Sequence, residues 1–117
     1  MRKLIVLLTV LITGCAGVAE MRADEPFATF ASAKSPEDVA ACTSEAWTLQ
    51  DRWPVTPDVR IIPIADGEQV MIYNAHSMSP DAFADITADG TGSRVVYYAK
   101  HRQAWKQSFA DLLQSCL

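Results

Sequence analysis

The stretch that decides the fold is 82–98, which reads AFADIT, then ADGTGS, then RVVYY. Its two ends, 82–87 and 94–98, are rich in β-branched and aromatic residues, and the segment 88–93 between them is rich in residues that tolerate turns. We therefore predict a β-hairpin. The segment 90–93 (GTGS) is similar in composition to phosphate-binding loops, but those loops open a helix, whereas a strand follows this one.

A second hairpin is predicted upstream of this stretch. Residues 59–64 (VRIIPI) and 70–73 (VMIY) have β-forming composition, and Asp66-Gly67 between them is a favoured hairpin turn. Pro63 cannot donate a backbone hydrogen bond, so the first of these strands is expected at an edge of the sheet or at a bulge.

Helices are predicted on either side of the hairpins. Ser35-Pro36-Glu37-Asp38 supplies an N-cap hydroxyl, a proline at the first helical position and acids in the first turn. Apolar residues then recur at helical spacing, as they do again near the C-terminus. The two stripes are Val39, Cys42, Ala46 and Leu49, and Trp105, Phe109, Leu112 and Cys116. We predict one α+β domain over 35–117, with a four-stranded antiparallel sheet and both helices on one of its faces.

The N-terminus has the form of an export signal. Arg2 and Lys3 precede an apolar run over 4–12, which is too short to span a bilayer, and small residues follow. Ile12-Thr13-Gly14-Cys15 resembles the lipobox of bacterial lipoproteins. That resemblance implies a signal peptide over 1–14, a lipid-modified Cys15 and a stable membrane anchor through two or three acyl chains. The alternative is an ordinary secretory signal.

Export to an oxidising compartment makes a disulfide between Cys42 and Cys116 the expected pairing, joining helix to helix. A metal site on these two thiols would need further ligands that the sequence does not identify. Ala16, in place of an aspartate after the lipobox cysteine, resembles lipoproteins that reach the outer membrane. We therefore expect a lipid-anchored protein of the bacterial envelope that faces the periplasm.

Residues 15–34 are rich in alanine and small polar groups and show no sustained periodicity. We predict a lipidated flexible tether with a reach of ~25 Å. The alternative is that Phe27 and Phe30 dock on the domain and order the segment.

The charge of the chain argues against nucleic-acid binding. Removal of 1–14 takes Arg2 and Lys3 from the ten basic residues and none from the fourteen acidic ones, so the net charge changes from −4 to −6. A nucleic-acid-binding domain needs a basic face.

The basic cluster consists of Arg94, Lys100, His101, Arg102 and Lys106. It is interpreted as a contact for an acidic partner or lipid headgroups, or alternatively as a solvated face.

Aromatic residues suggest an interaction surface. Tyr97 and Tyr98 are adjacent on a predicted strand and must point to opposite faces. If both helices cover one face of the sheet, Tyr73 and one of this pair would mark an open aromatic face of the kind used in protein recognition.

No motif predicts catalysis or a cofactor. His76 and Met78, with Met71, have the ligand types of a Cu(I) site but lack the repeated spacing of such sites. The serines, histidines and acids show no spacing that selects a catalytic set. The chain is similar to small lipoproteins of proteobacteria and their prophages. We expect a non-catalytic binding module for an unidentified envelope protein, with a small envelope enzyme or a metal or ligand carrier as alternatives.

Overall fold

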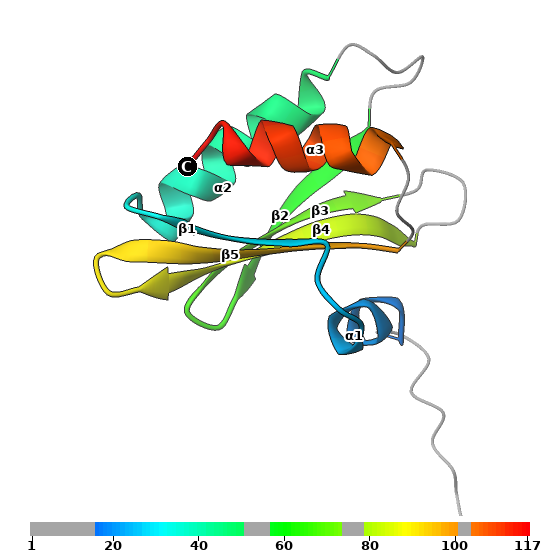
Figure 1. The fold of residues 1–117 in the computed structure, drawn as a ribbon, viewed down its shortest axis with the longest axis horizontal. Coiled ribbons are helices and arrows are strands. Elements are labelled where there is room, and N and C mark those ends of the chain that lie inside the picture. The colour runs from blue at the N-terminus through cyan, green and yellow to red at the C-terminus, as the bar shows by residue number, and fades with distance from the viewer. Residues whose placement is uncertain (1–15, 51–56, 74–78, 101–103) are drawn as a thin grey trace, which may run out of the picture.

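The computed structural model describes residues 16–50, 57–73, 79–100 and 104–117, which form one antiparallel sheet and three helices (Figure 1). The five strands are β1 (Ala28–Ser32), β2 (Asp58–Ile64), β3 (Gly67–Tyr73), β4 (Pro80–Asp89) and β5 (Gly92–Ala99), in the spatial order β1-β5-β4-β3-β2. The helices are α1 (Ala16–Ala23), α2 (Pro36–Thr48) and α3 (Ala104–Gln114). The α+β class is confirmed, but the sheet has five strands and not the predicted four.

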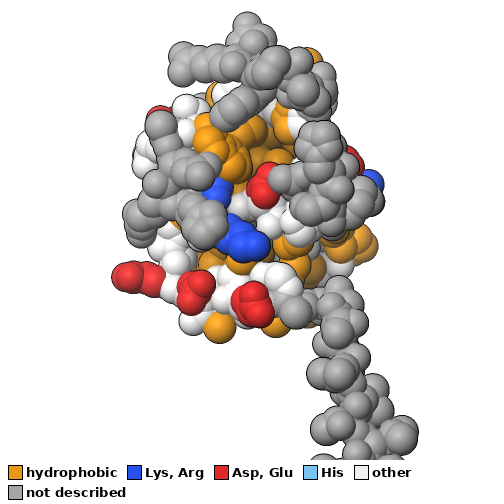
Figure 2. Space-filling view, turned by 90° about the vertical axis from the view of Figure 1, so that its right-hand side faces the viewer, with side chains coloured by type: hydrophobic (Ala, Val, Ile, Leu, Met, Phe, Trp, Pro, Cys, Tyr) orange, Lys and Arg blue, Asp and Glu red, His pale blue; other side chains and the backbone are white. Residues whose placement is uncertain are grey.

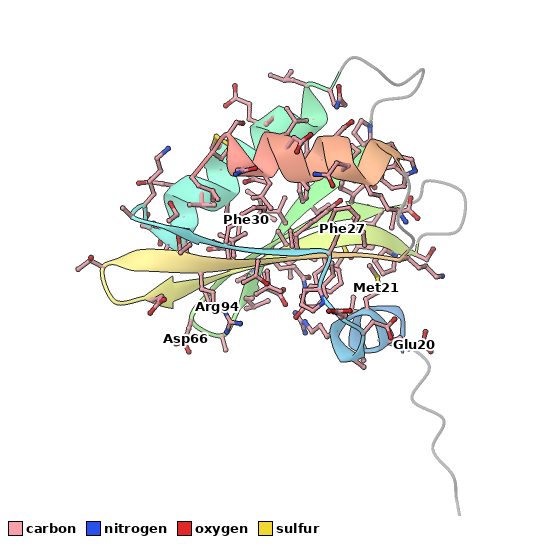
Figure 3. The ribbon with its side chains drawn as sticks, viewed as in Figure 1. Glu20, Met21, Phe27, Phe30, Asp66 and Arg94 are labelled. Carbon is pink, nitrogen blue, oxygen red and sulfur yellow. A yellow bond between two sulfur atoms is a disulfide. The ribbon has the colours of Figure 1, made fainter. Side chains whose placement is uncertain are left out.

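The additional strand, β1, comes from the segment that was predicted to be a tether. Its residues alternate between half-buried and exposed, and Phe30 packs against the main core. Phe27 donates a backbone hydrogen bond to the Tyr97 carbonyl at 2.8 Å and packs edge-on against the Tyr97 ring. Figure 3 shows Phe27 and Phe30 pointing into the space between the sheet and the helices. The alternative of docked phenylalanines therefore describes this segment, because pairing with β5 fixes its backbone.

Both predicted hairpins are present, but the first turn is shifted by one residue from the predicted Asp66-Gly67, and the second turn is shorter than predicted. Ile64 pairs with Gly67, so the first turn consists of Ala65 and Asp66, and Asp66 has a φ of 62°. A Cβ on Gly67 would collide with the Ile86 carbonyl oxygen, which explains a glycine at the start of β3. In the second hairpin, pairing continues to Asp89 and Gly92, and only Gly90-Thr91 forms the turn. Pro63 lies in β2, at the edge of the sheet, as predicted.

Helix α2 begins where the sequence predicts. The Ser35 hydroxyl accepts a hydrogen bond from the Asp38 backbone N–H at 3.2 Å, and Pro36 is the first helical residue. The buried stripe of α2 differs from the predicted one. It consists of Val39, Ala40, Thr43 and Trp47, whereas Cys42 is exposed.

The main core lies between the sheet and the pair α2 and α3. Trp47 and Tyr97 are fully buried at its centre, with Phe109 packed edge-on against the Trp47 ring. The Trp47 indole N–H donates to the Phe109 carbonyl at 2.9 Å, and this bond connects α2 to α3. The Trp47 side chain is thus both packed and hydrogen-bonded.

Cys42 and Cys116 form a disulfide, with their Cα atoms 5.7 Å apart. Cys42 lies on α2, but Cys116 lies in the turn that follows α3 and is buried. The prediction of a disulfide is confirmed. Its expected placement, helix to helix, is corrected to helix to C-terminal turn, because α3 ends at Gln114.

Candidate functional site

The candidate site lies on the sheet face opposite α2 and α3. Antiparallel pairing aligns one residue from each of four strands across this face, and paired residues point to the same side. The aligned residues are Arg60, Met71, Phe83 and Tyr98. A single row across the sheet therefore has an arginine at one end, a tyrosine at the other and apolar residues between them.

Helix α1 covers the centre of this row. Met21 points from α1 toward the sheet (Figure 3) and forms a second, smaller core with Met71 and Phe83. Met71 is 1% exposed and Phe83 is fully buried. The predicted open aromatic face is therefore closed at its centre, because the segment predicted to be a tether folds over it.

An ion pair holds α1 in this position. Arg22 donates two hydrogen bonds to the Asp85 carboxylate, from Nε at 2.9 Å and from Nη2 at 3.0 Å. Its guanidinium also lies 5.5 Å from the centre of the Phe83 ring. Gln69 donates to Asp85 Oδ1 at 3.1 Å. The hydrogen bond with Asp85 raises the pKa of Arg22, so the guanidinium keeps its positive charge.

Around the covered centre, two tyrosines and an arginine remain accessible. We call Arg60, Tyr73 and Tyr98 the tyrosine–arginine rim. Arg60 is exposed and lies 4.9 Å from the centre of the Tyr73 ring, and the half-buried Tyr98 stacks on Phe83 with ring centres 5.0 Å apart. Hydrogen bonds to Asp58 raise the pKa of Arg60 and fix its guanidinium at this position. Each rim side chain thus makes a contact within the domain.

Tyr97 does not belong to this surface. It is fully buried on the opposite face of the sheet, and its hydroxyl donates to the Lys106 carbonyl at 3.0 Å. Burial raises its pKa. Of the adjacent pair, Tyr98 is therefore the residue that shares a surface with Tyr73, and the role predicted for Tyr97 is corrected to a core residue.

The predicted basic cluster is only partly assembled. Lys100 is exposed at the end of β5, but Lys106 is 2% exposed, with its ammonium 4.9 Å from the centre of the Trp105 ring. Burial lowers the pKa of Lys106. Arg94 is exposed near the other end of β5, on the sheet face away from α2 and α3 (Figure 3). Residues six apart on a strand are separated by about 20 Å, so Arg94 and Lys100 do not form one patch.

Several predicted site residues lie outside the described residues. They are Cys15, His76, Met78, His101 and Arg102. Met71, the third residue of the copper hypothesis, is buried beneath α1. Within the described ranges, no group of three or more histidines, cysteines, aspartates and glutamates is arranged to hold a metal ion.

Sequence reasoning missed α1 and its ion pair. The signal was the spacing of Val18, Met21 and Arg22, but eight residues are too few for a periodic pattern to stand out. No helix in the described part of the chain is long and apolar enough to cross a membrane. In comparisons with protein-family models, curated proteins and solved structures, none matched the chain.

Proposed function

We propose that the protein is a lipoprotein of the bacterial envelope, anchored through acyl chains on Cys15, whose domain binds another envelope protein without catalysing a reaction. The lipobox residues Ile12 to Cys15 support the anchor. A disulfide between Cys42 and Cys116 suits an oxidising compartment. Ala16 at the position after the anchor favours delivery to the outer membrane.

The tyrosine–arginine rim is the observation that carries the binding role. Tyrosine and arginine are enriched among the residues that dominate the energy of protein interfaces. Here the Arg60–Tyr73 contact and the stacking of Tyr98 on Phe83 restrict the side chains in advance, which reduces the entropy lost on binding. The tyrosine–arginine rim is therefore better suited to contact with a protein than to contact with water alone.

Photo-crosslinking from the rim tests the binding role. A photoreactive phenylalanine analogue, which keeps an aromatic ring to stack on Phe83, replaces Tyr98 in the anchored protein in living cells, and a matched control places it at Gln107, an exposed residue of α3. We expect a discrete crosslinked protein from position 98 that is absent from position 107. The identity of that protein is then established by mass spectrometry.

Variants of the rim show whether the crosslink reports a binding energy. Loss of a central interface residue costs about 2 kcal/mol, or roughly thirtyfold in affinity, so Arg60→Ala should abolish the crosslink. Arg94→Ala removes an exposed arginine from the same sheet face outside the rim and should leave it intact. Identical crosslinking by wild type and both variants would rule out the rim as the binding surface.

A further inference from the structure

Helix α1 begins at Ala16, the residue that follows the lipobox cysteine in the sequence. Consecutive Cα atoms are about 3.8 Å apart, so no spacer separates an acylated Cys15 from a helix that is packed on the domain. We propose that the lipid anchor is fixed rigidly to the domain, so that one defined end of the sheet faces the headgroups of the bilayer. This inference rests on the proposed lipid anchor and adds the orientation in which it holds the protein.

The start of α1 is held at the start of β4. Gly17 lies so close to Pro80 that a Cβ on Gly17 would be 3.3 Å from Pro80 Cγ. Four residues later, Met21 is buried against the sheet, and Arg22 forms the ion pair with Asp85. Contacts at both ends of this short helix fix its direction as well as its position.

The end of the sheet beside α1 is the end that would face the bilayer. Lys100 follows β5 there and donates its backbone N–H to the Asp81 carbonyl at 3.3 Å. A pocket between α1 and the sheet is lined by Gly17, Glu20, Met21, Asp24, Ser79, Pro80 and Lys100. Figure 2 views the molecule from the side that faces right in Figure 1, where α1 lies, and shows basic side chains near the centre with acidic ones along the lower edge.

Acidic and basic side chains are mixed on this surface, so charge does not set the orientation. Glu20 and Asp24 line the same pocket as Lys100, so the surface offers no net attraction to anionic headgroups. The orientation of the domain is therefore set by the short covalent connection from Cys15 to the docked helix, without help from surface charge. This surface therefore faces the lipid headgroups of the bilayer that holds the Cys15 acyl chains, whether those headgroups are charged or neutral.

The turns of both hairpins lie at the other end of the sheet. Strand β4 has ten residues, and at ~3.3 Å per residue it separates Pro80 from the Gly90-Thr91 turn by about 30 Å. In contrast, Tyr98 and Tyr73 lie near the ends of β5 and β3 on the α1 side. An oriented domain would thus keep the tyrosine–arginine rim close to the bilayer, where it meets partners held in the same membrane.

Energy transfer to the bilayer surface tests this orientation. The lipidated protein carries a donor dye on a cysteine introduced at an exposed position, Lys100→Cys or Thr91→Cys, and is reconstituted into vesicles of phosphatidylethanolamine and phosphatidylglycerol with an acceptor dye on a headgroup. We expect roughly twofold more transfer from position 100, because the two ends of β4 differ by about 30 Å in height. Equal transfer from the two positions would overturn the proposal.

A linker variant shows whether the docked helix is the cause. Insertion of ten glycine and serine residues between Cys15 and Ala16 adds a flexible reach of about 18 Å. The difference between positions 100 and 91 should then shrink, and an undiminished difference would contradict a rigid anchor. The anchor itself has a separate readout, the mass of the N-terminal peptide. An unacylated Cys15 would refute the lipid anchor and with it the orientation, whereas an acylated Cys15 with equal transfer from positions 100 and 91 would refute the orientation alone.

Discussion

Arg22 on α1 and Asp85 on β4 form a two-bond ion pair, 63 residues apart in the sequence. This pair joins α1 to the sheet face away from α2 and α3. It also explains why Met71 and Phe83 are buried on that face, since the helix that it holds covers them.

Replacement of Arg22 should release α1. Arg22→Ala removes both hydrogen bonds and leaves Asp85 beside a buried phenylalanine, and a partly exposed bidentate pair is worth about 1 kcal/mol. We expect faster amide hydrogen exchange over 16–23, with little change in β3 to β5. Arg94→Ala is the matched control, as an exposed arginine of the same face. Unchanged exchange in α1 would show that the ion pair does not hold the helix.

Removal of the disulfide should lower global stability. Cys42 and Cys116 are separated by 74 residues, and the chain-entropy model assigns about 4 kcal/mol to a loop of that length. Urea unfolding of the oxidised protein and of the Cys42→Ala, Cys116→Ala double variant measures the difference. A double variant as stable as the oxidised wild type would contradict this role.

Tyr97 should make the folded protein sensitive to strong alkali. Its pKa is raised by burial, so above pH 10 the phenol ionises in the unfolded chain while it stays protonated in the folded one. The free energy of unfolding should therefore fall as pH rises beyond about 10. Tyr97→Phe should weaken this fall, while losing about 1 kcal/mol at neutral pH with the hydrogen bond to Lys106. If the free energy of unfolding falls equally with pH above 10 in the variant and in the wild type, Tyr97 is not the cause of the alkaline sensitivity.

Lys106 should have the opposite effect on the pH dependence. Its pKa is lowered by burial, so between the lowered value and the ordinary value near 10.5 the unfolded chain holds a proton that the folded protein has released. Stability from this group therefore rises with pH across that interval, and at neutral pH the buried ammonium is a cost. Lys106→Met should raise the melting temperature at pH 7. A lower melting temperature would mean that the charge is compensated.

Elements with a local chemical signature were predictable from the sequence. The Ser35 cap, the proline after it and the residues of both hairpins act on the backbone within a few positions. Strand β1 was not predictable in this way, because its five residues gain their partners from β5, more than 60 positions away. Its absence from the prediction is also why the sheet was expected to have four strands.

In the candidate site, too, local features were predictable from the sequence and features set by tertiary contacts were not. Alternation places Tyr97 and Tyr98 on opposite faces, but which of them is buried depends on the strand register and on what covers each face. The stripe of α2 was assigned one residue out of phase, at Cys42 instead of Thr43, because a rotation of about 100° per residue leaves a short pattern ambiguous. Tertiary contacts decide both points.

The most direct test of the proposed anchor is the mass of the N-terminal peptide of protein purified from bacterial membranes. Trypsin should release the peptide 15–22, which ends at Arg22. We expect this peptide to begin at Cys15, with a diacylglyceryl group on sulfur and an acyl chain on the amine. A peptide that continues upstream of Cys15, or one with an unmodified cysteine, would contradict it.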